Sequence, residues 1–171
     1  NDILNVSTHL ISILDPHELI TSLVQQFVNV VPDVQAGLLW LQDKQGGLQI
    51  RSFSGLAAAP DANLLNRLFL RPGDGLAGSV WQRNEVTIIE GAGRYAERAY
   101  RVSPRVYDDM RAVVALLPPH EAVVLLPLHI GKQVLGVLEL FYTTAQAVQS
   151  QHNIQMLQTF ADLAAGAINN A

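Results

Sequence analysis

Two apolar runs between Val123 and Tyr142 stand out in the pattern of hydrophobic and polar positions along the chain. Each run has the length of a strand and is rich in Val and Leu. The polar break between them contains Gly131, which tolerates the positive φ of a tight turn. The pattern therefore predicts an antiparallel hairpin. Because neither run alternates with polar residues, both faces of this hairpin should be covered, which places it in the middle of a sheet.

Two residues interrupt the predicted hairpin. Pro127 cannot donate to the hydrogen-bond ladder, and Gly136 weakens a strand unless another backbone passes close to it. We therefore expect a β-bulge near these two positions.

Helical spacing of apolar residues predicts a helix over residues 2–14. Its stripe follows steps of three and four, the spacing of a coiled-coil seam, and consists of Ile3, Val6, Leu10 and Ile13. The stripe packs on the sheet of its own domain or faces a partner, and two heptads do not decide between these alternatives.

A second helix should begin at Asp15, which is a suitable N-cap with Pro16 at the first helical position and Glu18 three residues after the cap. Its broad apolar face indicates a core helix, and Pro32 ends it. A second hairpin is predicted from the runs at 36–41 and 48–54, which are separated by a glycine-containing turn.

The remaining elements are predicted in chain order. They are a short helix within 56–70, a glycine-rich turn at 73–78 that opens a helix, a strand at 85–90, a long segment at 91–120 and a closing helix from about residue 149.

The segment at 91–120 differs in composition from the rest of the chain. It holds five of the eleven basic residues, mixed with three tyrosines: Arg94, Arg98, Arg101, Arg105 and Arg111, with Tyr95, Tyr100 and Tyr107. Thirty residues without a strong strand or helix pattern are typical of a lid or binding loop.

The closing helix is apolar on two faces. One stripe consists of Ile154, Leu157, Ala161, Ala164 and Ile168, and a second of Met156, Phe160, Leu163 and Ala167. The small residues of the first stripe would let a second helix approach closely. We therefore expect a homodimer formed through the first stripe together with the stripe of residues 2–14.

Composition and charge limit the number of domains and the kinds of partner that the chain can have. The 171 residues are 49% hydrophobic and 15% charged, which fits a single globular domain over 1–171. A net charge of −4 argues against a nucleic-acid partner. No apolar run approaches the roughly 18 residues of a membrane span, so we expect no membrane insertion and a cytoplasmic location. The chain begins at Asn1 and stops within a predicted helix, so we expect a module with adjacent signalling domains in a longer protein.

The order of these elements resembles a GAF domain, a sensory module related to PAS domains. The residues that carry the resemblance are the turn Gly73-Asp74-Gly75-Leu76-Ala77-Gly78, the strand pair with Leu126-Pro127-Leu128, Gly131 and Leu135-Gly136-Val137-Leu138-Glu139-Leu140, and the closing Phe160-Ala161 to Ala171. The resemblance implies an α+β sandwich with a central antiparallel sheet of five to six strands. It places the terminal helices on one face, and short helices, the long loop and a ligand cavity on the other.

The resemblance also bears on the ligand. GAF domains that attach bilins, and those that reduce free methionine sulfoxide, use cysteines, and this chain has none. The acidic pair Asp108-Asp109 lacks the Asn and Phe partners of the cyclic-nucleotide signature. Haem-binding members use a histidine, but His120, which lies beside prolines, is more typical of a solvated loop residue. No histidine pair has ligand spacing, so no metal site and no cofactor are predicted.

Guanidinium groups and tyrosines together suit a small anionic or aromatic ligand. The candidate ligand-binding residues are Arg71, Gly75, Trp81, Arg94, Tyr95, Arg98, Tyr107 and Arg111. The alternative is a solvated loop whose arginines pair with Glu97, Asp108 and Asp109. The amides of the glycine-rich turn are more typical of a tight turn than of a phosphate loop, because no Walker spacing is present.

No nucleophile arrangement is recognisable, so we predict a non-catalytic sensory and dimerisation module of a sensor histidine kinase or a cyclic-di-nucleotide enzyme. A first alternative is a structural dimerisation module without a ligand, its cavity filled by Phe69, Trp81 and Tyr107. A second is the ligand-binding domain of a transcription regulator, and an enzyme on the same fold is a third.

Overall fold

The computed structural model describes residues 15–170. The helix predicted over residues 2–14, with its stripe of Ile3, Val6, Leu10 and Ile13, lies outside this range.

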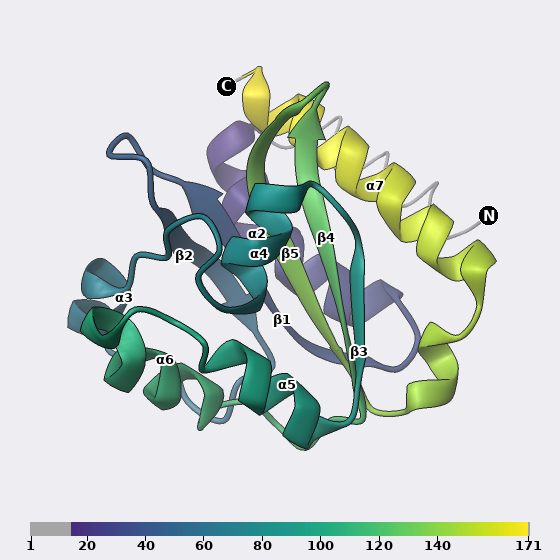
Figure 1. Cartoon of the computed structure of the whole chain (residues 1–171). Helices are drawn as coiled ribbons and strands as arrows, with labels where there is room; N and C mark the ends of the chain where they lie inside the picture. The colour runs from purple at the N-terminus through teal and green to yellow at the C-terminus, as the bar shows by residue number, and fades with distance from the viewer. Residues whose placement is uncertain (1–14, 171) are drawn as a thin grey trace.

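A single antiparallel sheet of five strands runs through the described part of the chain, in the order β2-β1-β5-β4-β3 (Figure 1). The strands are β1 (Val34–Gln42), β2 (Leu48–Ser54), β3 (Thr87–Glu90), β4 (Ala122–Ile130) and β5 (Gln133–Tyr142). The predicted central hairpin is confirmed, because β5 is the middle strand and β4 pairs with it. The α+β fold class is confirmed as well.

The turn and the irregularity of the central hairpin follow from its sequence. Gly131 has a φ of 59° in the turn. The register of β4 and β5 shifts between Leu128 and His129, next to Pro127, as predicted. At Gly136 a Cβ atom would collide with the carbonyl oxygen of Trp40 on β1, so glycine permits β1 and β5 to pair closely here.

Two long helices cover one face of the sheet, which we call the terminal-helix face (Figure 1). They are α2 (Pro16–Val30) and α7 (Gln151–Asn169). Asp15 caps α2 as predicted, since its Oδ1 accepts a hydrogen bond of 2.8 Å from the backbone N–H of Glu18. The two helices meet at Phe27 and Phe160, whose rings are 4.2 Å apart and close to perpendicular.

Short helices cover the opposite face, which we call the lid face (Figure 1). They are α3 (Ala62–Arg67), α4 (Gly75–Arg83), α5 (Ala92–Ala99) and α6 (Tyr107–Val114), with a 3₁₀ turn η1 (Pro104–Val106) between the last two. A second 3₁₀ turn, η2 (Ala145–Val148), precedes α7.

The segment at 91–120 is more regular than its sequence predicts. Instead of the predicted lid or binding loop without regular structure, it contains α5, η1 and α6. The physical reason is that each helix has an anchoring pair on one side, Tyr95 with Ala99 in α5 and Met110 with Val113 in α6, and all four are buried on the lid face.

The side chains of β5 alternate between the two faces. Leu138, Leu140 and Tyr142 belong to the core beneath α2 and α7, whereas Val137 and Phe141 belong to the core beneath the lid helices. One strand therefore contacts both layers of the molecule.

Candidate functional site

A carboxyl group is buried in the middle of the lid face. Glu139 on β5 is 1% exposed. Its Oε1 accepts a hydrogen bond of 2.6 Å from Trp40 Nε1, and its Oε2 lies 2.9 Å from the hydroxyl of Tyr95 on α5. No ion pair within residues 15–170 involves this carboxyl group. Its hydrogen-bond donors are thus neutral.

Burial changes the protonation of this cluster. It raises the pKa of Glu139 from 4.5 to about 7, although the hydrogen bonds from Trp40 and Tyr95 oppose the rise. Burial and the neighbouring carboxyl group also raise the pKa of Tyr95 well above its usual value. Near neutral pH, Glu139 exchanges a proton while Tyr95 stays neutral. Ionised Glu139 accepts from both partners, and protonated Glu139 has a proton of its own to donate.

An aromatic group borders the buried carboxyl. Tyr95 packs edge-on against Phe141 at 5.3 Å and against His120 at 5.5 Å, measured between ring centroids. His120 Nδ1 lies 2.9 Å from the carbonyl oxygen of Pro118, which makes this nitrogen the donor and leaves Nε2 as an acceptor. Nε2 is buried and has no hydrogen-bond partner among the described residues. His120 as a whole is half-buried, so it is less exposed than the solvated loop residue that the sequence predicted.

The structure brings one of the predicted site residues, Tyr95, into this cluster. The functional residues that sequence reasoning missed are Trp40 and Glu139. The sequence contained a signal for Glu139, because it is the single charged residue of β5 and interrupts the apolar run at 134–142. Trp40 carried no signal that distinguishes it from a core residue, since its partner is 99 positions away.

The other predicted lid residues lie at the surface. Arg94 is exposed and Arg98 is half-buried. Arg111 lies over the ring of Tyr100, 5.5 Å from its centroid, and donates a hydrogen bond of 3.2 Å to the hydroxyl of Tyr107. Arg111 and Tyr107 therefore interact with each other on α6 rather than with the buried carboxyl group.

The remaining predicted residues hold the lid in place. Trp81 on α4 is half-buried, and its indole N–H donates to the carbonyl oxygen of Val134 at 3.1 Å. Gly75 has a φ of 59°, and its N–H donates to the carbonyl oxygen of Arg101 at 2.8 Å. The glycine-rich turn thus uses this amide to anchor the segment after α5, in agreement with a structural turn. Arg71 is exposed beside this turn.

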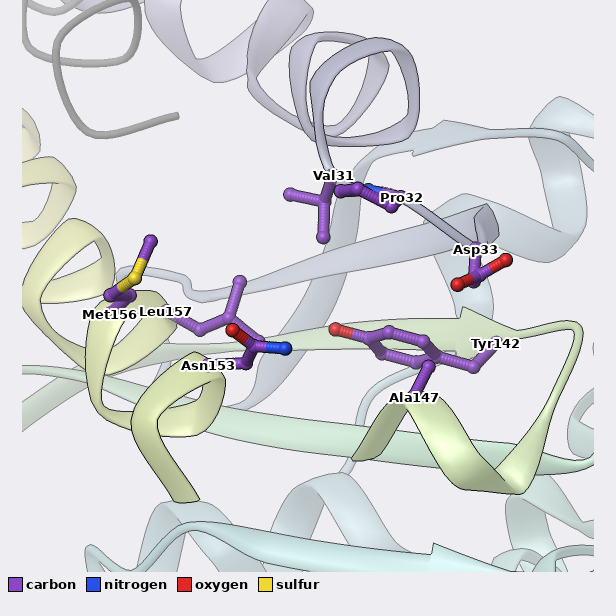
Figure 2. A pocket seen from close by; sticks show the side chains of 8 residues that line it. All are labelled: Val31, Pro32, Asp33, Tyr142, Ala147, Asn153, Met156 and Leu157. Carbon is purple, nitrogen blue, oxygen red and sulfur yellow. The ribbon is translucent and has the colours of Figure 1, made fainter. Parts of the chain in front are cut away.

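Trp40, Tyr95 and Phe141 fill the space between α5 and the sheet, with exposed fractions of 0, 1 and 0%. A pocket of about 160 Å³ lies instead on the terminal-helix face, between the end of α2, the end of β5 and the start of α7 (Figure 2). The ring of Tyr142 forms part of its wall, and burial, followed by the charge of Asp33, raises the pKa of its hydroxyl. This tyrosine remains a neutral hydrogen-bond donor.

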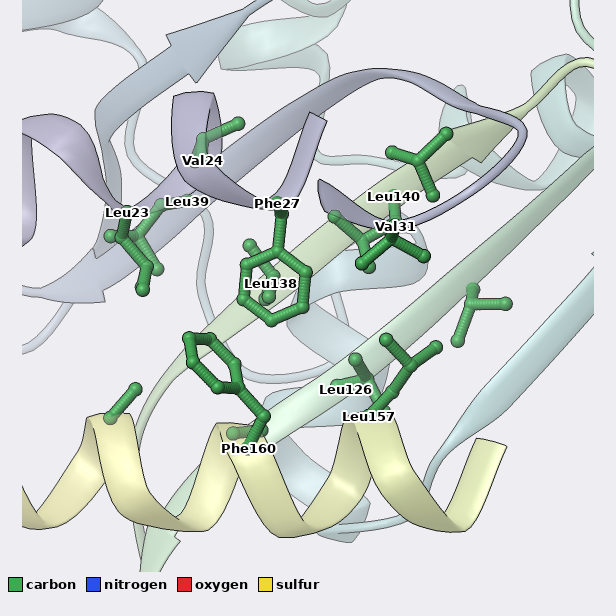
Figure 3. Close-up of a cluster of buried hydrophobic side chains, with 14 of the residues drawn as sticks. Leu23, Val24, Phe27, Val31, Leu39, Leu126, Leu138, Leu140, Leu157 and Phe160 are labelled. Carbon is green, nitrogen blue, oxygen red and sulfur yellow. The ribbon is translucent and has the colours of Figure 1, made fainter. Parts of the chain in front are cut away.

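The predicted dimer stripe of α7 faces its own sheet over most of its length. Figure 3 shows Leu157 projecting from α7 among the side chains of the terminal-helix core. Leu157, Ala161 and Ala164 are 4, 0 and 1% exposed, and Ile154 and Ile168 are half-buried against the same core. The outward face of α7 carries Leu163, which is 40% exposed.

Residues 15–170 contain no cluster of three His, Asp or Glu side chains that would hold a metal ion. Across the same residues, every helix is too short or too polar to cross a bilayer.

The fold and the site together define a small α+β domain with a buried polar cluster on one face of its central sheet. The sequence model of the GAF domain family matches residues 14–169. The chain therefore belongs to the GAF domain family, as its sequence pattern predicted. A comparison with curated proteins finds no significant match.

Solved structures support the same fold. The GAF domain from Acinetobacter phosphoenolpyruvate-protein phosphotransferase is 20% identical, with a TM-score of 0.75 over 99% of this chain and 92% of its own. Residues 122 to 287 of a methyl-accepting chemotaxis protein are 19% identical, with a TM-score of 0.72 over 96% and 95%. The free methionine-R-sulfoxide reductase from Neisseria meningitidis in complex with its substrate is 13% identical, with a TM-score of 0.69 over 98% and 86%. Similar folds thus occur in signalling proteins and in an enzyme.

Proposed function

We propose that this GAF domain is a non-catalytic sensory module that receives a signal on the lid face and passes it through α2 and α7 to an adjacent domain. The proposal sets aside the reductase chemistry of similar structures because the chain contains no cysteine. The adjacent domain, by the same proposal, belongs to a sensor histidine kinase or a cyclic-di-nucleotide enzyme.

The observation that carries the proposal is the position of Glu139 on β5. Its side chain bonds to Tyr95 of the lid, while its neighbours Leu138 and Leu140 pack beneath α2 and α7. A change in the lid that alters the bonds of Glu139 therefore acts on a strand that supports both long helices. Two packed layers that share a strand provide the basis for a two-state response.

The proposed signal is a small molecule that binds between α5 and the sheet and replaces Tyr95 as a partner of Glu139. The carboxyl group of Glu139 lacks a cationic partner among the described residues. Its partner on the lid is the neutral hydroxyl of Tyr95. A ligand with its own hydrogen-bond donor can make the same bond, and α5 is a helix of only eight residues between two loops.

Spin labels on the two long helices test this route. The chain has no cysteine, so Glu18→Cys on α2 and Thr159→Cys on α7, both at exposed positions, give one label pair. We expect Tyr95→Phe, which removes the hydroxyl bound to Glu139, to shift or broaden the distance distribution between the labels. The control Tyr107→Phe removes a surface hydroxyl and should leave the distribution unchanged. An identical distribution in Tyr95→Phe and the unsubstituted chain would contradict the route.

A second candidate function is that of a structural dimerisation module without a ligand. The close packing of Trp40, Tyr95 and Phe141 on the lid face favours it. The sequence-based version of this idea used Phe69, Trp81 and Tyr107 as the filling residues, but all three retain exposed surface. Mass spectrometry of an extract of the purified protein separates the candidates, because a copurifying small molecule supports the sensory module and contradicts the ligand-free one.

Dimerisation itself is proposed to use the outward face of α7. Leu163→Glu places a charge on this face without touching the buried stripe of Leu157, Ala161 and Ala164. We expect this variant to lower the dimer fraction in sedimentation, with the neighbouring exposed position Gln155→Glu as the control. Truncation of α7 is a poor test, because it would remove part of the domain core.

A further inference from the structure

A second polar site lies at the outer edge of the sheet, away from Glu139. A pocket of about 240 Å³ opens between the β1–β2 turn, the loop that joins α3 to α4, and the 3₁₀ turn η1. Its walls contain two arginines and no carboxylate, and they consist of Gln45, Gly46, Gly47, Phe69, Arg71 and Arg105.

The carboxylate of Asp74 and one pair of backbone hydrogen bonds hold together the chain segments that line this pocket. The carboxylate of Asp74 accepts from the N–H of Arg71 at 2.9 Å and, with its other oxygen, from the N–H of Ser103 at 3.1 Å. Leu48 and Leu70 exchange two backbone hydrogen bonds of 2.9 Å, which hold the segment of Arg71 against β2. Arg71 and Arg105 therefore line one pocket although they come from different loops.

The charges of this pocket are not compensated locally. Arg105 Nη2 donates to the carbonyl oxygen of Phe69 at 3.0 Å, which orients its guanidinium group. Within residues 15–170, the guanidinium groups of Arg71 and Arg105 form no ion pair, in contrast to Arg67 with Asp109 and Arg101 with Glu97.

Two acidic residues in the adjoining turns accept hydrogen bonds from backbone amides. Asp43 Oδ1 accepts from the N–H groups of Gln45 and Gly47, both at 3.0 Å, and so shapes the turn on the opposite wall. Asp74 is engaged with Arg71 and Ser103 in the same way. The two carboxylates thus build the pocket without lining it.

We propose that this pocket binds the phosphate group of a small phosphorylated molecule. Two guanidinium groups suit a doubly charged oxyanion, because each offers parallel N–H donors, and the side-chain amide of Gln45 adds a neutral donor. Phe69 provides an apolar surface for the remainder of the molecule. The proposal concerns a different pocket from the lid cluster and does not depend on the proposed function.

Phenyl phosphate is a suitable probe, since it combines a phosphate with an apolar ring. We expect its titration at constant ionic strength to shift backbone amide resonances of residues 45–47 and 69–71 in two-dimensional NMR spectra. Arg71→Gln should weaken binding at least about tenfold, the size expected for a lost charged hydrogen bond. Arg105→Lys, which keeps the charge but loses the planar group, should also weaken it.

Two controls make the test decisive. Arg94→Gln removes an exposed arginine of the lid that does not line the pocket, and its affinity should match the unsubstituted chain within about twofold. Tyr95→Phe should also leave the affinity unchanged, which separates this site from the lid cluster. The absence of shifts at 45–47 and 69–71, or equal weakening by Arg71→Gln and Arg94→Gln, would overturn the proposal.

Discussion

The two faces of the sheet are built by different means. The terminal-helix face is covered by α2 and α7, of 15 and 19 residues, over a core of aliphatic and aromatic side chains. The lid face is covered by helices of six to nine residues, and a carboxyl group is buried in its centre. Burial of apolar surface stabilises both faces, but only the lid face also carries the cost of a buried acid.

The difference suggests a division of roles between the faces. Long helices on an apolar core resist local opening, and short helices joined by loops open more readily. A protonation change at Glu139 also starts on the lid face, where Trp40 and Tyr95 donate to this carboxyl group. The comparison therefore assigns stability mainly to the terminal-helix face and responsiveness to the lid face, and four measurements test it.

The largest effect is expected from Phe160→Ala on the terminal-helix face. Phe160 is 3% exposed and packs against Phe27, so its truncation should lower the free energy of unfolding by about 3–5 kcal/mol in urea denaturation. Leu163→Ala on the same helix is the control, because this side chain is 40% exposed and should cost much less. Equal losses in the two variants would remove the basis for the comparison.

The next effect is a pH dependence that originates on the lid face. Folded Glu139 holds its proton up to a pKa of about 7, whereas the unfolded chain releases it near 4.5. The folded state therefore binds more protons between these values, and stability falls as the pH rises from 4.5 to 7. Relative to Glu139→Gln, the free energy of unfolding should fall by about 3 kcal/mol over this range, since each unit of pKa difference between the folded and unfolded states corresponds to about 1.4 kcal/mol. Parallel stability profiles for the two proteins would contradict the assignment.

A smaller effect is expected from Trp40→Phe, which removes one donor to the buried carboxyl group. The unpaired oxygen should cost about 1–3 kcal/mol, and the midpoint of the pH dependence should move upward, because this hydrogen bond lowers the pKa of Glu139. The matched control is Trp81→Phe, whose indole bonds to a backbone carbonyl near the surface. A lower midpoint in Trp40→Phe would argue against its role as a donor to this acid.

The smallest effect is expected at the surface of the lid. Glu97 and Arg101 form an ion pair of 2.9 Å in which both side chains are about two-thirds exposed. Glu97→Gln should therefore change the free energy of unfolding by less than about 0.5 kcal/mol. A decrease of more than about 1 kcal/mol in the free energy of unfolding would mean that this ion pair stabilises α5 more than an exposed pair ordinarily does.

The elements that the sequence predicted well depend on local rules. The start of α2 follows from Asp15 and Pro16, and the turn of the central hairpin follows from Gly131. Gly136 also indicated the close passage of another backbone, because a glycine in a strand interior needs such a reason.

The elements that it predicted less well depend on which distant segments meet. The cluster at Glu139 requires β1 to pair with β5 and α5 to lie over both, and no local pattern contains that information. The same reason explains why the stripe of α7 predicted to form a dimer contacts its own sheet instead. The sequence of a helix with two apolar stripes does not reveal which stripe meets its own sheet. For the lid arginines, the composition of the segment did not indicate that Arg94, Arg105 and Arg111 would be exposed, because that depends on how the lid helices pack on the sheet.

The buried acid also has a consequence for how the chain assembles. If β5 slid by one residue along β1, its side chains would exchange faces, and Glu139 would enter the aliphatic core between α2 and α7. There it would lose both Trp40 and Tyr95, and an unpaired acid in such surroundings costs several kcal/mol. Glu139 therefore raises the free energy of a sheet in which β5 is out of register, and so favours the native strand pairing during folding.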